Sequence, residues 1–108
     1  MNAEEVIVVL VSVAGAEEGA RIGGTLVEEG LAACVNVVGP VRSIYRWKGA
    51  VEEATEHLLL VKARAADFGA LAARVQALHS YAVPEVLALP VHAGAAPYLA
   101  WLAEATAR

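Results

Sequence analysis

Two long extended segments joined by a tight turn constrain the fold of this 108-residue chain more than any other feature. Residues 31–48 and 51–64 are rich in strand-forming side chains, and only Gly39-Pro40 interrupts the first segment, as a bulge or bend would. The stretch Lys48-Gly49-Ala50, where the first segment ends, is typical of a tight turn. About 16 residues of strand at ~3.3 Å each reach ~50 Å, whereas a compact domain of 100 residues is roughly 35 Å across. We therefore expect a β-hairpin whose tip, made polar by residues 52–56, projects beyond the domain.

The remaining segments predict an alternation of strands and helices around this hairpin. Continuous apolar runs predict strands, and apolar residues at helical spacing predict helices. The expected strands are residues 6–13 and 86–91, and the expected helices are residues 15–30, 67–78 and 97–105. Right-handed crossovers place the first two helices on one face of a four-stranded antiparallel sheet. The expected fold is α+β, a ferredoxin-like βαββαβ domain over residues 1–108 with an extra C-terminal helix.

Two helices carry more detailed expectations. The Gly23-Gly24 pair inside the first helix weakens its helix propensity, which predicts that the helix packs very closely on the sheet. In the last helix, an apolar stripe is expected from Tyr98, Trp101, Leu102 and Ala105.

The composition favours self-association. Hydrophobic residues make up 58% of the chain and charged residues 19%, against roughly 45–50% and about 25% in average globular proteins. Apolar surface beyond the needs of one small core tends to lie in subunit contacts. The open edges of a projecting hairpin invite pairing with another copy, and we expect Tyr45 and Trp47 near its tip to lie in that interface.

The charge pattern excludes several classes of partner. The net charge is −4 and no two basic residues are adjacent, which argues against nucleic acid and against an anionic membrane surface as partners. The apolar run at residues 6–11 is far too short to span a bilayer. The acidic start lacks the positive region of a secretory signal, and the single Cys34 can form no internal disulfide. We expect a cytoplasmic protein.

The segment from His79 to Glu85 brings an imidazole, a phenol and a carboxylate together around a Val-Pro step. It joins the end of a helix to the start of a strand, and Pro84 stiffens it by pushing Val83 into an extended conformation. Short stiff connectors between rigid elements are common places for binding residues. A plain loop with a helix-capping histidine is the alternative, and the residues alone leave both open.

Three residues offer the ligand types of a copper or zinc site, namely Cys34, His79 and Glu85. No CxxC, HxH or HExxH spacing is present, so tertiary or inter-subunit proximity must build any such site. A lone cysteine is more often a small buried apolar residue.

A second grouping offers a different chemistry. Lys62, His79, Tyr81 and Glu85 are candidates to line an anion- or metabolite-binding cleft between subunits. No nucleophile with a recognisable partner is present, so neither an enzyme nor an organic cofactor is expected.

Four spaced motifs resemble the CutA divalent-cation tolerance proteins. They are Leu-Ala-Ala-Cys-Val-Asn at 31–36, Ser-Ile-Tyr-Arg-Trp-Lys-Gly at 43–49, His-Ser-Tyr-Ala-Val-Pro-Glu at 79–85 and Tyr-Leu-Ala-Trp at 98–101. The resemblance covers nearly the whole chain, although Ser80 stands where that family usually has proline. It implies a homotrimer joined by strand pairing between subunits, and a link to tolerance of copper and other divalent metals.

We therefore expect a non-enzymatic trimer that binds copper, or another divalent cation, weakly through Cys34, His79 and Glu85. The alternative is a trimeric small-molecule or anion sensor that uses the cleft of Lys62 and Tyr81, with an indirect metal phenotype.

Overall fold

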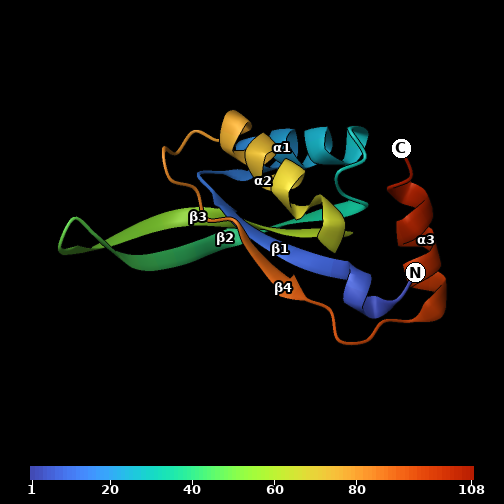
Figure 1. Ribbon diagram of the computed structural model, residues 1–108. Helices are drawn as coiled ribbons and strands as arrows, with labels where there is room; N and C mark the ends of the chain where they lie inside the picture. Colours follow the sequence, from blue (N-terminus) through green and yellow to red (C-terminus); the bar gives the residue numbers. More distant parts are fainter.

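Four antiparallel strands in the order β2-β3-β1-β4 carry α1 and α2 on one face in the computed structural model, which describes all 108 residues (Figure 1). The third helix lies at the end of the sheet remote from the hairpin, beside both chain termini. The predicted α+β fold is confirmed. The elements are β1 (Val6–Val13), α1 (Ala16–Glu28), β2 (Cys34–Trp47), β3 (Ala50–Arg64), α2 (Phe68–Leu78), β4 (Leu87–Pro90) and α3 (Ala96–Ala105), with short 3-10 turns at Ala3–Glu5 and Ala65–Asp67.

The main core lies between the sheet and the two helices that cover it. Successive strand residues point to opposite faces, so every second residue of β1 and β3 meets the helices. Fully burying one such side chain contributes about 1.5–3 kcal/mol, so this layer supplies most of the stabilisation of the domain. Its largest fully buried side chains are those of Val9, Val11, Val13, Ile22, Leu26, Leu59, Val61, Leu71 and Val75.

A glycine lets α1 approach the sheet closely, as the Gly23-Gly24 pair predicted. A Cβ atom added at Gly23 would lie 2.9 Å from Cγ1 of Val35 in β2, whereas one added at Gly24 would meet nothing within 4 Å. Gly23 is therefore the member of the pair that packing requires.

The hairpin of β2 and β3 projects as expected. Lys48 and Gly49 both have positive φ, 49° and 81°, which is the backbone of a two-residue type I′ turn. The predicted bulge is present, because Gly39 and Pro40 together lie opposite His57. The molecule is 44 Å long against widths of 25 and 23 Å, and the hairpin tip accounts for the excess length (Figure 1).

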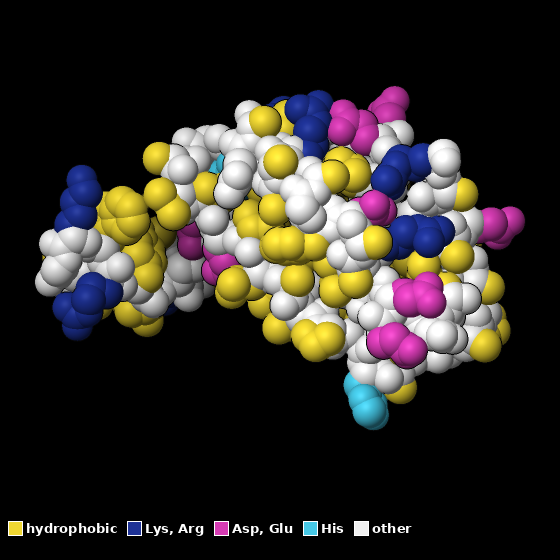
Figure 2. Space-filling view, in the orientation of Figure 1, with side chains coloured by type: hydrophobic (Ala, Val, Ile, Leu, Met, Phe, Trp, Pro, Cys, Tyr) yellow, Lys and Arg dark blue, Asp and Glu magenta, His cyan; other side chains and the backbone are white.

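The second face of the sheet has no helix over it. Leu87 and Leu89 of β4 share this face with Val8 and Leu10 of β1, and 57% of the Leu87 surface is exposed. Hydrophobic side chains are spread over the body and along the hairpin (Figure 2). No helix of the chain is both long enough and apolar enough to cross a lipid bilayer.

The predicted stripe on the last helix is correct only in part. Leu99 and Leu102 are the residues that α3 buries, in a small second cluster with Val6 and Ala33. Trp101 remains 43% exposed, with its ring centroid 5.4 Å from that of Tyr98. Because α3 packs on the narrow end of the sheet, only one row of its side chains reaches the body.

The two glycines of α1 supply a matched pair of substitutions. Gly23→Ala should lower the free energy of unfolding by about 1–2 kcal/mol, because the clash with Val35 outweighs the better helix propensity of alanine. Gly24→Ala should raise it by up to about 1 kcal/mol. Thermal unfolding at one protein concentration measures both. A Gly23→Ala protein that melts as high as the Gly24→Ala protein would contradict the packing role of Gly23.

Candidate functional site

A pocket of about 570 Å³ lies between the projecting hairpin and the connector that follows α2. Tyr45 and Trp47 of β2 and Glu56 of β3 form the hairpin side, Ser12 of β1 lies at its base, and residues 81–85 form the other side. A volume in this range is typical of small-molecule sites. The pocket opens on the side of the sheet that the helices leave uncovered.

The connector is held in place by His79, which follows the last residue of α2. Its imidazole is fully buried, with Nε2 2.7 Å from the carbonyl oxygen of Ser12. Its Nδ1 accepts a hydrogen bond from the backbone N–H of Tyr81 at 3.0 Å. Nε2 therefore carries the proton and donates, and both ring nitrogens are occupied. Only the backbone N–H of His79 bonds α2, at the carbonyl of Val75, whereas its ring bonds β1 and the connector and so positions the pocket wall from behind.

A second anchor comes from a residue that the sequence did not single out. The carboxylate of Glu18 in α1 accepts hydrogen bonds from the backbone N–H and hydroxyl of Ser80 and from the backbone N–H of Ala14, at 2.7, 3.0 and 3.2 Å. Burial acts to raise the pKa of Glu18, but the bonds from Ser80 and Ala14 outweigh it and lower the pKa. Proline has no N–H, so it could not make the backbone bond that Ser80 makes.

Glu56 is a buried carboxylate in the wall of the pocket, not part of the polar hairpin tip as predicted. Only 7% of its surface is exposed, and its Oε2 accepts a hydrogen bond from the hydroxyl of Tyr81 at 2.6 Å. Burial and this bond to the carboxylate hold the pKa of Tyr81 well above its usual range, so the phenol stays a neutral donor. The sequence signal that could have placed Glu56 on this face is the alternation of side chains along β3, because Glu56 points to the same side of the strand as Leu58 and Leu60.

The predicted cleft of four residues is only partly assembled. Tyr81 and Glu85 line the pocket, whereas His79 lies behind it. Lys62 is six positions beyond Glu56 on β3, which is ~20 Å along the strand. Its ammonium donates to the side-chain oxygen of Asn36 and to the carbonyl of Leu60. Within one chain the strand carries Lys62 away from the pocket, so the predicted cleft that includes it would have to form between subunits.

The three predicted metal ligands do not meet within one chain. Cys34 of β2 lies opposite Lys62 of β3, and Lys62 lies opposite Val8 of β1. Val8 is four positions before Ser12, whose carbonyl oxygen bonds His79. Four positions span ~13 Å of strand, so the thiol and the imidazole are far apart. No group of three His, Cys, Asp or Glu side chains could hold a metal ion. The predicted metal site of Cys34, His79 and Glu85 is therefore not formed within one chain.

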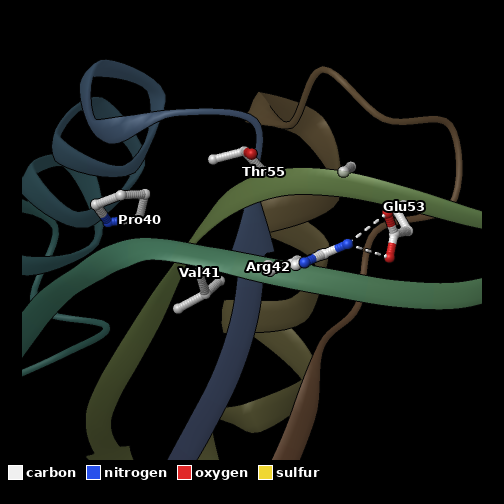
Figure 3. A pocket seen from close by; sticks show the side chains of 6 residues that line it. Pro40, Val41, Arg42, Glu53 and Thr55 are labelled. Atoms are coloured by element: carbon white, nitrogen blue, oxygen red, sulfur yellow. Dashed lines mark hydrogen bonds and ion pairs between the residues drawn. The ribbon is translucent and has the colours of Figure 1, made fainter.

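A second hollow lies on the opposite face of the hairpin. It measures about 500 Å³ and is lined by Pro40, Val41, Arg42, Glu53, Ala54 and Thr55. Arg42 extends across the two strands to Glu53, with its Nη2 2.8 and 2.9 Å from the two carboxylate oxygens (Figure 3). Both side chains are more than half exposed, so this pair contributes at most about 1 kcal/mol. Since the two charges satisfy each other, the first pocket is the better candidate site.

Tyr81→Phe tests the structural role of the buried carboxylate. The change removes the only hydrogen-bond donor to Glu56 and should lower the free energy of unfolding by about 1–3 kcal/mol. Tyr45→Phe is the matched control, since that hydroxyl makes no hydrogen bond, and should change it by no more than about 0.5 kcal/mol. Urea unfolding at one protein concentration measures both, and equal midpoints for the two variants would contradict the role of the Tyr81 hydroxyl.

Comparison with known proteins places this architecture among solved relatives. A structure of the divalent cation tolerance protein CutA1 from Thermus thermophilus superimposes with a TM-score of 0.91 at 51% identity, over 94% of this chain and 99% of that one. The Thermus thermophilus sequence named divalent-cation tolerance protein CutA is 52% identical over 99 residues, covering 92% of this chain and 96% of the relative.

A plant relative extends the comparison. Protein CutA 1, chloroplastic, from Oryza sativa is 46% identical over 100 residues, covering 93% of this chain. The chain spans only 56% of the length of that relative. The sequence profile of the CutA1 divalent ion tolerance proteins matches residues 7–105. That match includes every strand and helix apart from the first residue of β1 and the opening 3-10 turn. This chain therefore belongs to the CutA1 divalent ion tolerance protein family.

Proposed function

We propose that this chain acts as a homotrimer in the tolerance of divalent metal ions, and that it binds copper or another divalent cation without catalysing a reaction. The match of residues 7–105 to a divalent ion tolerance family carries this proposal. The Thermus thermophilus relative named for divalent-cation tolerance supports it. The single unpaired Cys34 supports a cytoplasmic location, although the rice relative is named chloroplastic.

Two surfaces of the chain support assembly. The uncovered face of the sheet exposes Leu87 and Leu89, and the hairpin exposes nearly half of Trp47. Contiguous apolar surface of this kind on a small domain usually marks a contact with another protein. The sheet also ends in two unpaired edges, β2 and β4, and closed cyclic symmetry lets copies cover such edges without growing into a filament.

Trp47→Asp tests whether the hairpin holds the trimer together. We expect wild-type protein to scatter light as three subunits of 11.2 kDa. In the proposed trimer the Trp47 ring is buried between subunits, so a charge at this position should release smaller species at micromolar concentration. Burying one Trp contributes several kcal/mol, at ~25 cal/mol per Å² over some 150–250 Å². Trp101→Phe, a conservative change on α3, should leave the mass unchanged. A wild-type mass of one subunit would contradict the trimer, and an intact Trp47→Asp trimer would contradict the role of Trp47.

The copper proposal requires ligands from more than one chain. Within one chain Cys34, His79 and Glu85 do not meet, and His79 would have to give up a hydrogen bond to expose a ring nitrogen. Cys34 is the only thiol and the softest ligand available, so it is the first residue to test.

Titration of the assembled protein with Cu(II) and Zn(II) tests these ligands. Cys34→Ala and His79→Ala should each weaken copper binding by about tenfold or more if they are ligands or orient one. Calorimetry on protein purified without an affinity tag measures the effect and avoids metal bound by a tag. Equal binding by the wild type and both variants would remove Cys34 and His79 as ligands.

A second candidate function rests on the pocket itself. A small-molecule sensor or scaffold needs a formed cleft, and the hairpin and connector enclose one of suitable size. In this alternative the link to metal tolerance is indirect. The observation that favours it is the pair of anchors, Glu18 and His79, that hold the connector rigid before any ligand arrives.

A further inference from the structure

We infer that the neighbouring subunit of the trimer supplies Lys62 to the carboxylate of Glu56, so that the pocket of each chain is completed by a residue of the next copy. This inference rests on the proposed homotrimer and names a residue pair that joins its subunits. It also gives the predicted grouping of Lys62 with Tyr81 and Glu85 a place between subunits. The open side of the pocket is then covered by the neighbouring copy.

The uncovered face of the sheet carries two opposite charges on a mostly apolar surface. Glu56 and Lys62 both lie on this face of β3, on either side of Leu58 and Leu60. The neighbouring strands add apolar side chains to the face, namely Val8, Leu10, Val38, Leu87 and Leu89. The proposed trimer buries this face, and a buried charge without a partner is strongly destabilising. Each of the two charges therefore needs an opposite charge from elsewhere in the assembly.

Glu56 has one carboxylate oxygen without a partner. Only 7% of the residue is exposed, and its Oε2 accepts the hydrogen bond from Tyr81. Its Oε1 accepts none within the chain, yet it is absent from the fully buried atoms that lack a partner, so it is open to the pocket. Figure 2 shows acidic side chains beside hydrophobic ones where the hairpin leaves the body. One hydrogen bond from a neutral phenol does not compensate a buried negative charge.

Lys62 has a donor to spare. Its ammonium carries three N–H groups and uses two of them, on the side-chain oxygen of Asn36 and on the carbonyl of Leu60. None of the ion pairs within the chain includes Lys62. Lys62 is six positions from Glu56, which is ~20 Å along the strand. A pair between the two residues must therefore join two chains.

The other lysine and arginine side chains are bonded within the chain or lie away from the pocket. Four arginines form ion pairs with carboxylates, namely Arg21, Arg42, Arg74 and Arg108. Arg64 shares the face of Lys62 but is hydrogen-bonded to α3. Arg46 alternates with Trp47 along β2 and so points to the opposite face of the hairpin. Lys48 in the turn, 6.0 Å from the centroid of the Trp47 ring, is the one rival of Lys62.

Cyclic symmetry satisfies both charges at once. In a head-to-tail contact one surface of a subunit meets a different surface of the next, and a closed ring leaves neither surface free. Lys62 towards one end of the uncovered face and Glu56 towards the other are complementary points of this kind. Each subunit gives one lysine and receives one, so a trimer forms three pairs. Such pairs fix the register of an otherwise apolar contact.

A double-mutant cycle on the assembled protein tests the pair. Glu56→Gln keeps an acceptor for Tyr81, Lys62→Met keeps the apolar stem, and each leaves the opposite charge buried alone. Each single change should raise the protein concentration at which half of the trimer dissociates by at least about tenfold. The double variant leaves no charge unpaired and should lie within about threefold of the wild type. Light scattering along a dilution series, at one fixed concentration of urea, measures all four proteins.

Non-additivity in this cycle reports a contact between chains, because residues ~20 Å apart in one chain do not couple directly. Additive effects, with a double variant about a hundredfold weaker than the wild type, would overturn the pair. If Glu56→Gln or Lys62→Met fails to fold, Glu56→Met or Lys62→Gln takes its place in the cycle.

Two control cycles test the rival residues. Lys48→Met is combined with Glu56→Gln, and Glu85→Gln, which changes the exposed carboxylate of the pocket, is combined with Lys62→Met. Both control cycles should be additive. A coupling in either that exceeds the coupling of Glu56 with Lys62 would assign the contact to another residue and overturn the inference.

The mass of the wild-type protein separates this inference from the function on which it rests. A mass of one subunit would leave the uncovered face to some other partner and would overturn the trimer and the pair together. A wild-type trimer in which the changes at Glu56 and Lys62 are additive would overturn the pair and leave the trimer standing.

Discussion

The rest of the structure depends on the unequal pairing of β3. Its inner half, from His57 onward, has β1 as a neighbour, and β2 pairs along its other edge from Cys34 to Trp47. Its outer half pairs with β2 alone and has no helix over it. Backbone hydrogen bonds therefore continue where the core has ended, and both faces of the outer hairpin must find cover from something other than this chain's helices. The pocket lies where these two halves of the strand meet.

The opposite wall of the pocket depends on a few polar contacts rather than on regular structure. His79 is tied to the carbonyl of Ser12, and Ser80 is tied to Glu18, so the seven-residue connector is fixed to β1 and α1 at its first two positions. Tyr81 then reaches across to Glu56 and joins the connector to the hairpin. Because each contact is made by the chain itself, the wall is organised before any ligand or partner binds, which lowers the entropic cost of binding.

The family relationship suggests a metal site, but the residues that line the pocket are not a set of metal ligands. Tolerance of divalent cations suggests a metal centre, yet one chain places its thiol far along the sheet from the connector imidazole and the pocket carboxylates. The pocket instead combines aromatic rings with a buried carboxylate, Glu56, which accepts a hydrogen bond from Tyr81. A metal site would therefore have to be built between copies of the chain.

The sequence by itself determined the strands, the helices, the sheet, the hairpin turn and bulge, and the projection of the hairpin, because apolar periodicity, glycine and proline act locally and chain length limits the size of a core. It also identified the connector and two of its pocket residues, Tyr81 and Glu85. Only the tertiary structure decided that Glu56 is buried, that Glu18 anchors Ser80, and that Lys62 and Cys34 lie away from the pocket. These facts depend on strand register and on contacts between residues 25 to 62 positions apart, whereas the alternation of β3 gives only the face on which Glu56 lies.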